Sequence, residues 1–351
     1  MIVYFPPLHA RHAPPCEIFR GERVPCFETP ERAAIVHEAL RQRGHALREP
    51  DRDSSPFLAR VHTPPYLAFL ETAWARWLAL DADNAGRQPF PSVWPVRSLR
   101  SDVEPGNFIA QLGLYSFDNG TPISAGTWLA AKQAADAAVS AVACLGAGEV
   151  GVFSAGRPPG HHAGRDFMGG YCFLNHAAVA AEALREAGCR RVAILDVDYH
   201  HGNGTQSLFY DRADVLFVSI HGDPRSEYPF YLGHADETGS GAGAGFNLNL
   251  PLPAGSSVAD WFSALDVALA RIAGFRPEAL VVSLGLDTYA GDPISRFALQ
   301  AADFRQLGRC LRRQNLPTAF ILEGGYAVAA LGVNAAGVLD GFEESCPGGP
   351  A

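Results

Sequence analysis

The stretch RVAILDVDYHHGNGT (191–205) passes directly from a short apolar run into a dense polar cluster. A continuous apolar run of this length is typical of a parallel strand that is covered on both faces. If the extended backbone continues, Asp196, Asp198 and His200 point to the same side, because strand side chains repeat every second residue. The stretch therefore predicts a site just past the carboxyl end of a buried strand, where open α/β sheets bind their ligands.

The same pattern extends outward from this strand in both directions. Further apolar runs predict strands at 150–154, 215–220, 279–284 and 318–322. Between them, capping residues and terminal glycines predict helices at 29–44, 127–146, 175–188 and 257–274. This alternation predicts a single α/β domain over residues 1–351, with three αβα layers and a mostly parallel central sheet. We expect an irregular insertion at about 9–28 and long loops at about 85–124 and 222–256.

Composition limits the classes of partner and compartment. Of the 351 residues, 48% are hydrophobic and 19% are charged, which is enough apolar content for a large core. The formal net charge is −9 and Lys132 is the one lysine, so the chain has no basic stripe for nucleic acid. No apolar run reaches the roughly 20 residues of a membrane span. Seven scattered cysteines without C-x-x-C spacing are typical of reduced thiols, and we expect a cytoplasmic protein.

Three more polar clusters follow predicted strands, namely RPPGHH (157–162), SLGLD (283–287) and EGGY (323–326). Because the carboxyl ends of parallel strands share one edge of a sheet, we expect all four clusters to meet. Asp198, His200 and Asp287 would then bring two carboxylates and one imidazole together. Zinc accepts such ligands, and a catalytic zinc site keeps a further position open for water or substrate.

Other residues of these clusters suit acid–base chemistry beside such a metal. His161 and His162 titrate in the range that a general base and a general acid need, and Asp196 is a candidate partner for one of them. Tyr326, on a Gly-Gly turn, can donate a hydrogen bond to an oxyanion. Taken singly, a His-His pair can be a polar turn and an Asp-x-Asp pair can be a helix cap or loop feature. Their joint occurrence after four strands favours the metal site.

In this order, the four motifs resemble the zinc-dependent histone deacetylase and acetylpolyamine amidohydrolase family of the arginase–deacetylase superfamily. The resemblance covers nearly the whole chain, from TPER (29–32) to EGGY (323–326), and includes GLDTYAGDP (285–293). It implies the arginase/deacetylase fold and an enzyme that removes acetyl groups from acetylated amines. The closer match is to the acetylpolyamine branch, which implies a homodimer in which the insertion at about 9–28 shapes the active-site mouth.

The resemblance also implies roles for individual residues. Zinc, or Fe(II) in its place, would be bound by Asp198, His200 and Asp287. The catalytic residues would be His162 as principal general base and acid, His161 as its electrostatic partner, Asp196 and Asn203 behind the two histidines, and Tyr326 as the transition-state tyrosine. Many histone-type members carry Asp where Asn203 stands, and we expect the amide to change the pKa of His162.

A substrate tunnel and two sites for monovalent cations are implied in the same way. Tyr171 and Tyr228 match the aromatic pair that lines the tunnel, and Gly170 lies beside the first of them. Structural K⁺ or Na⁺ would be bound at a first site by Asp196, Asp198, His200, Ser219 and Ile220. The residues of a second site would be Phe209, Arg212, Val215 and Phe246.

The substrate stays open between acetylpolyamines, acetyl-lysine and another small N-acyl amine. Acetylpolyamine members place acidic residues on the rim of the site, and Ile109 and Gly120 stand at those positions here. Asp102, Glu104 and Asp118 lie nearby in the sequence and are candidates to replace them.

Two other functions fit the sequence less well. A binuclear ureohydrolase needs an Asp-x-His-x-Asp pattern, whereas this chain has Asp-x-Asp-x-His at 196–200, which supplies too few ligands for two metals. A non-catalytic protein that binds acylated amines typically lacks a metal ligand or the tyrosine, whereas this chain has them all.

Overall fold

A parallel sheet of eight strands forms the centre of the computed structural model, which describes residues 1–96, 98–100 and 102–344. The strand order is β4-β1-β5-β10-β9-β6-β7-β8, and every neighbouring pair is parallel. The strands are β1 Ile2–Tyr4, β4 Ala46–Arg48, β5 Gly151–Ser154, β6 Val192–Asp196, β7 Val215–Gly222, β8 Asn247–Leu252, β9 Ala279–Leu284 and β10 Thr318–Leu322. The predicted parallel sheet is confirmed.

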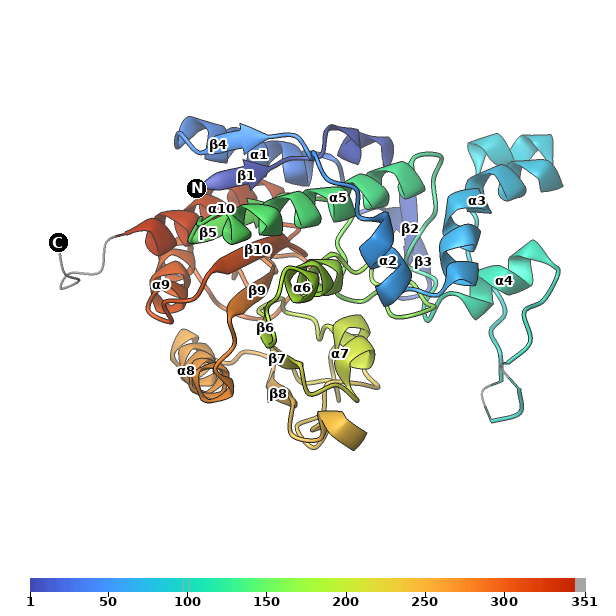
Figure 1. Cartoon of the computed structure of the whole chain (residues 1–351). Helices are drawn as coiled ribbons and strands as arrows, with labels where there is room; N and C mark the ends of the chain where they lie inside the picture. The colour runs from blue at the N-terminus through green and yellow to red at the C-terminus, as the bar shows by residue number, and fades with distance from the viewer. Residues whose placement is uncertain (97, 101, 345–351) are drawn as a thin grey trace.

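Helices cover both faces of this sheet and give the three layers that the sequence predicts (Figure 1). They are α1 Glu31–Gln42, α2 Ser55–Val61, α3 Pro64–Leu80, α4 Phe108–Leu114, α5 Thr127–Gly146, α6 His176–Glu186, α7 Asn203–Phe209, α8 Val258–Phe275, α9 Ala301–Arg312 and α10 Val328–Glu343. None of these helices, within the described part of the chain, combines the length and the hydrophobicity of a membrane span.

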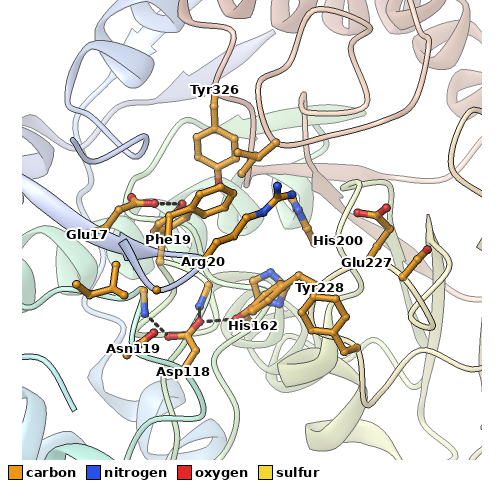
Figure 2. A pocket seen from close by; sticks show the side chains of 18 of the residues that line it. Glu17, Phe19, Arg20, Asp118, Asn119, His162, His200, Glu227, Tyr228 and Tyr326 are labelled. Atoms are coloured by element: carbon orange, nitrogen blue, oxygen red, sulfur yellow. Dashed lines mark hydrogen bonds between the residues drawn. The ribbon is translucent and has the colours of Figure 1, made fainter. Parts of the chain in front are cut away.

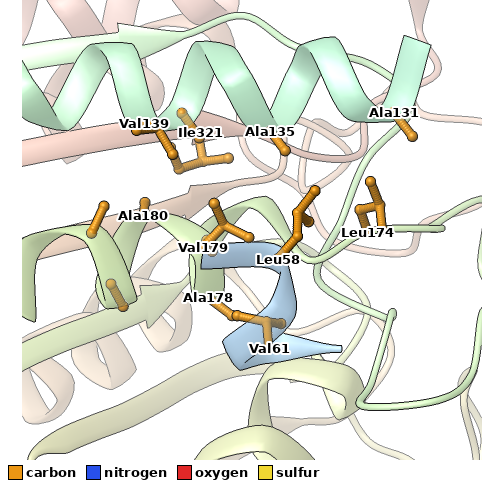
Figure 3. Close-up of a cluster of buried hydrophobic side chains, with 14 of the residues drawn as sticks. Leu58, Val61, Ala131, Ala135, Val139, Leu174, Ala178, Val179, Ala180 and Ile321 are labelled. Atoms are coloured by element: carbon orange, nitrogen blue, oxygen red, sulfur yellow. The ribbon is translucent and has the colours of Figure 1, made fainter. Parts of the chain in front are cut away.

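The alternation of side chains along each strand separates two hydrophobic cores. In β6, Ile194 belongs to the core beneath α5 and α6, whereas Leu195 belongs to the core beneath α8, α9 and α10. Figure 3 shows the first core, where Ile321 of β10 lies near Val139 of α5 and Val179 of α6. Because both faces of the central strands are buried, their sequences are continuous apolar runs.

Capping residues set the starts of two helices where the sequence predicts them. The Asn175 side chain accepts a hydrogen bond from Ala178 N at the start of α6. Ser257 and Asp260 form a complete capping box at the start of α8. The expected cap at Thr29 is absent from the described α1, which begins after Pro30 with no side-chain cap bond.

The segments expected to be irregular contain regular elements. The insertion at about 9–28 forms a two-stranded hairpin of β2 Cys16–Phe19 and β3 Glu22–Pro25. The segment 85–124 contains α4. Residues 97 and 101 of this segment, like residues 345–351 at the end of the chain, lie outside the described residues. The segment 222–256 contains β8, an edge strand that pairs with β7 alone and is half-buried, so it lacks the continuous apolar run of a central strand.

Glycines allow α9 and α10 to approach each other closely on the second face. A Cβ atom built on Gly308 of α9 would lie 2.0 Å from the backbone oxygen of Val338 in α10. A Cβ built on Gly341 of α10 would lie 2.0 Å from the backbone oxygen of Arg305 in α9. Backbone atoms cannot move aside as a flexible side chain can, so neither position has room for a larger residue.

Gly308→Ala is therefore expected to lower the free energy of unfolding, measured by urea denaturation, by about 1–3 kcal/mol through overpacking. Gly337→Ala, in the middle of α10, is the matched control, because its Cβ would meet no atom closer than 3.5 Å. That control should raise stability by about 0.5–1 kcal/mol, since alanine costs less backbone entropy in a helix. Equal effects of the two substitutions would contradict the close contact between α9 and α10.

Candidate active site

The four polar clusters follow four strands that are neighbours in the sheet. The order β5-β10-β9-β6 places the segments after Ser154, Leu322, Leu284 and Asp196 side by side. The register agrees, because Ser283 of β9 pairs with both Asp196 of β6 and Ile321 of β10. Parallel pairing therefore gathers the clusters at one edge of the sheet.

Asp198, His200 and Asp287 lie together at this edge. One ligand atom from each residue lies within 4.8 Å of the others. His200 Nδ1 lies 3.1 Å from Asp287 Oδ2 and 3.3 Å from Asp198 Oδ1. Backbone amides orient both carboxylates, since Gly324 N donates to Asp198 Oδ2 at 2.8 Å and Tyr199 N donates to Asp287 Oδ1 at 2.8 Å.

The surroundings of these three residues fit a divalent cation. Burial and the charge of Asp198 raise the pKa of Asp287 to about 8. Burial disfavours a charged imidazole, yet hydrogen bonds and charge from both carboxylates outweigh it and raise the pKa of His200 to about 10. A Cβ on Gly285 or Gly324 would lie 2.3 Å or 2.6 Å from Asp198 Oδ2, so only glycine leaves this space free. Two carboxylates and one imidazole that take up protons when no cation is bound are a ligand set for a metal such as zinc.

His161 and His162 lie beside this cluster and differ in charge. His161 Nδ1 lies 3.0 Å from Asp196 Oδ2, and charge from Asp196 and Asp198 overcomes burial to raise the pKa of His161 to about 10. His162 Nδ1 lies 2.7 Å from Asn203 Oδ1. Burial, followed by the nearby charges of His161 and His200, lowers the pKa of His162 well below its ordinary value.

The pairing with Asn203 also selects the tautomer of His162. An amide oxygen only accepts, so Nδ1 of His162 carries the proton and donates it to Asn203 Oδ1. Nε2 is then left with a free lone pair on a residue that lines the cavity. Gly170, whose φ is +53°, packs against this ring, and a Cβ there would lie 2.2 Å from His162 Cδ2.

Tyr326 completes the base of the cavity. Its backbone N donates to Asp292 Oδ2 at 2.6 Å, and its ring lies 4.7 Å from the guanidinium carbon of Arg32. Arg32 also donates to the backbone oxygens of Glu323 and Gly325, each at 2.6 Å. Burial raises the pKa of the Tyr326 hydroxyl well above its ordinary value, so the hydroxyl stays a donor.

Tyr171 and Tyr228 also line the cavity, and Figure 2 shows Tyr228 beside His162. The Tyr171 ring lies 5.5 Å from that of Tyr326, and the Tyr228 ring lies 5.1 Å from that of His162. The Tyr171 hydroxyl donates to Glu17 Oε1 at 2.7 Å, and the Tyr228 hydroxyl donates to Asp118 Oδ2 at 2.6 Å. The cavity of about 370 Å³ is large enough for a small ligand.

Some residues of this site have no role in the sequence-based prediction. Glu17 and Asp118 fix the two tunnel tyrosines, although the sequence offers Asp118 only as a rim residue. Glu28 joins the buried guanidinium groups of Arg32 and Arg157. Arg157 belongs to the RPPGHH motif, so the sequence draws attention to it. The contacts of Glu17 with Tyr171, of Glu28 with Arg157 and of Arg32 with the backbone at 323–325 join residues far apart in the chain, and no local pattern predicts them.

The residues implied for monovalent cations lie on neighbouring elements of the same half of the sheet. Ser219 of β7 pairs in register with Asp196 of β6, and its Oγ lies 2.8 Å from His221 Nδ1. In the second set, Arg212 N donates to Phe209 O at 3.0 Å, while Val215 begins β7. Cation binding stays a prediction at both sites. The first comprises Asp196, Asp198, His200, Ser219 and Ile220, and the second comprises Phe209, Arg212, Val215 and Phe246.

His162, His200 and Tyr326 line one cavity, and the carboxylates of Asp198 and Asp287 lie beside His200; this arrangement defines a metal-dependent hydrolase. The family model described as the histone deacetylase domain matches residues 26–342. The chain belongs to this family of hydrolytic deacetylases, and the resemblance stated from the motifs is confirmed.

Individual relatives match over nearly their whole length. Acetylpolyamine amidohydrolase 2 of Pseudomonas aeruginosa is 49% identical over 336 residues, which cover 95% of both chains. Acetylpolyamine amidohydrolase of Mycoplana ramosa is 44% identical, covering 97% of this chain and 99% of its own. A crystal structure of acetylpolyamine aminohydrolase from Burkholderia pseudomallei superposes with a TM-score of 0.93 at 42% identity, covering 97% of this chain and 98% of its own. The arginase/deacetylase fold predicted from the sequence is confirmed.

Glu28→Gln tests the buried charge network behind Tyr326. The two arginines lower the pKa of Glu28 to about 2 from 4.5, although burial alone would raise it. Glu28 therefore stabilises the fold fully above about pH 4.5, and this contribution is lost as the pH falls toward 2. Removing the carboxylate from its buried partners should cost about 3–5 kcal/mol at pH 7.

Urea denaturation between pH 3 and pH 7 measures this effect. The variant should lose less stability than the native protein as the pH falls, because the native protein alone loses the ionised Glu28. Glu22→Gln, on the exposed side of the hairpin, is the control and should change stability by less than about 0.5 kcal/mol. A Glu28 variant as stable as this control would contradict the role of the network.

Proposed function

We propose that this protein hydrolyses N-acetylated amines to acetate and the free amine. The observation that carries the proposal is the gathering of Asp198 and Asp287 around His200, which lines one cavity together with His162 and Tyr326. The named activity of the relatives, which are acetylpolyamine amidohydrolases at 44–49% identity, supports it. We propose zinc as the ion, with Fe(II) as the alternative, and K⁺ or Na⁺ at the two monovalent sites.

The wider setting of the enzyme is part of the same proposal. One domain over residues 1–351 would act as a homodimer in the cytoplasm, with a small acetylated amine as its partner and without nucleic acid or membrane. The absence of a basic stripe in a chain of net charge −9 supports the exclusion of nucleic acid.

The metal supplies Lewis acidity when bound, which polarises an amide carbonyl and makes water a better nucleophile. Nε2 of neutral His162 accepts a proton from the attacking water and later delivers it to the departing amine. The Tyr326 hydroxyl donates a hydrogen bond to the oxyanion that develops on the carbonyl oxygen. Tyr171 and Tyr228 hold the alkyl chain of the substrate between their rings and exclude water from it.

His161 keeps the general base in its working state. As an imidazolium held by Asp196, it places positive charge beside His162, with ring centroids 4.0 Å apart. This charge opposes protonation of His162, so Nε2 stays free to accept a proton at neutral pH. The two histidines therefore do different work, although they are neighbours in the chain.

The proposed function is tested by metal removal combined with Tyr326→Phe, using a fluorogenic acetyl-lysine substrate and N-acetylcadaverine. Chelation should abolish turnover, and one Zn²⁺ per chain should restore it. Tyr326→Phe should lower kcat by about 100- to 1,000-fold without loss of the metal, because an oxyanion donor is removed. Tyr231→Phe, whose side chain is exposed, is the control. Turnover that survives complete metal removal would refute the proposal, and two ions per chain would favour a binuclear site.

Asn203→Asp tests the electrostatic setting of the base. A carboxylate 2.7 Å from Nδ1 would stabilise the imidazolium form, so the pKa of His162 should rise. The base is then protonated at higher pH, and the acidic limb of the pH profile of kcat/KM should move upward by about 1–2 units. Asn107→Asp adds the same charge at the N-cap of α4 and should leave the profile in place. An unmoved limb in Asn203→Asp would contradict the assignment of His162.

A further inference from the structure

The end of the substrate that stays outside the tunnel meets a cavity mouth with two arginine side chains. Arg20, at the turn of the β2–β3 hairpin, and Arg296, in the segment before α9, both line the cavity. Figure 2 shows the Arg20 side chain extending from the hairpin across the pocket. Its side chain is exposed and, within the described residues, forms no hydrogen bond or ion pair, and the guanidinium carbon lies 5.1 Å from the Phe19 ring.

The carboxylates that line the same cavity already have partners. Glu17 is buried and accepts from the Tyr171 hydroxyl and from Phe27 N. Asp118 accepts from the Tyr228 hydroxyl, from Gly170 N and from the Thr121 hydroxyl. These two acids therefore hold the tunnel walls and do not face the mouth as free charges.

The remaining charged pair at the mouth is nearly balanced. Glu227 Oε1 lies 3.5 Å from Arg296 Nε, with side chains 12% and 58% exposed. Gly120 contributes no charge to the lining, and Ile109, which belongs to α4, packs against the first hydrophobic core. Among the described residues of the cavity lining, Arg20 is thus the exposed charged side chain without a hydrogen bond or ion pair, whereas Glu17 and Asp118 are held by neutral hydrogen-bond donors.

Arg20 also occupies a backbone position that does not suit arginine. Phe19 pairs with Glu22, so the hairpin turns through two residues, Arg20 and Gly21, with φ of +52° and +84°. Two-residue turns with positive φ at both positions favour Asn, Asp or Gly at the first of them. A strained arginine whose side chain lines a cavity indicates a role for that side chain in binding.

We propose that Arg20 selects acetylated amines whose far end is a carboxylate, such as N-acetylated ω-amino acids, over amines whose far end is an ammonium group. The selection rests on the proposed deacetylation, since it concerns the tail of the same substrate. A guanidinium binds a carboxylate through two parallel hydrogen bonds, whereas it repels an ammonium group. Arg296 adds positive charge to the lining of the same cavity, and this charge is weakened by Glu227.

Three substrates of equal length test the selection with the metal-loaded protein. They are N-acetyl-5-aminopentanoate, N-acetylpentylamine and N-acetylcadaverine, whose tails are negative, neutral and positive. We expect kcat/KM to fall in that order, with about a 10-fold span between the two charged tails at low salt. The span should shrink in 0.5 M NaCl because salt screens exposed charges.

Two variants of Arg20 separate the side chain's charge from its place in the turn. Arg20→Glu should reverse the order of the charged substrates when kcat/KM of each is expressed relative to that for N-acetylpentylamine. Arg20→Asn should remove the preference and keep or raise the thermal midpoint, because Asn suits the turn. Arg23→Gln, on the same hairpin but outside the cavity lining, should keep the native order.

The outcomes distinguish this selection from the function on which it rests. The selection alone is refuted if the protein hydrolyses N-acetylpentylamine but prefers the ammonium tail. It is also refuted if Arg20→Glu leaves the preference unchanged. A metal-loaded protein that hydrolyses none of the three substrates, nor an acetyl-lysine peptide, refutes the deacetylation as well. Reversal in Arg20→Glu with the native order in Arg23→Gln supports both.

Discussion

Two buried carboxylates that face each other at the edge of the sheet impose the constraint on which the site depends. Asp198 and Asp287 have no solvent exposure, and their mutual repulsion must be offset by a cation or by protons. Gly285 and Gly324 leave the space around them free, and backbone amides orient their oxygens. A bound metal would relieve this repulsion and would supply a Lewis acid at this edge of the sheet.

Neighbouring charges and burial also explain why the residues around the two carboxylates differ in protonation state. His161 and His162 are adjacent and both buried, yet Asp196 and Asp198 keep the first charged, while burial and the charges of His161 and His200 keep the second neutral. Behind Tyr326, Glu28 compensates two buried arginines, and Arg32 bonds the backbone on both sides of the Gly-Gly turn. The protonation state of each of these side chains is decided by its burial and by the charges of its neighbours, and not by its distance from the metal site.

Much of the sheet is readable in the sequence, because its central strands are buried on both faces and are therefore continuous apolar runs. β9 and β10 appear at the predicted residues. β1 and β4 have three residues each, too few for a periodic pattern, and β8 is a half-buried edge strand that resembles a loop. The hairpin of the insertion went unpredicted, since its strands are short and pair only with each other.

By itself, the sequence determined which residues meet at the edge of the sheet, because each polar cluster directly follows a strand and stays attached to its carboxyl end. Only the tertiary structure decided which side chains support them. Glu17 reaches Tyr171 across 154 positions of the chain, and Asp118 reaches Tyr228 across 110. Such contacts leave no local pattern, since they depend on how the hairpin and the loops pack over the sheet edge. For the same reason, Arg20 could be recognised as the unpaired charged side chain among the described residues of the cavity only from the structure, which gives the partners of the cavity's carboxylates.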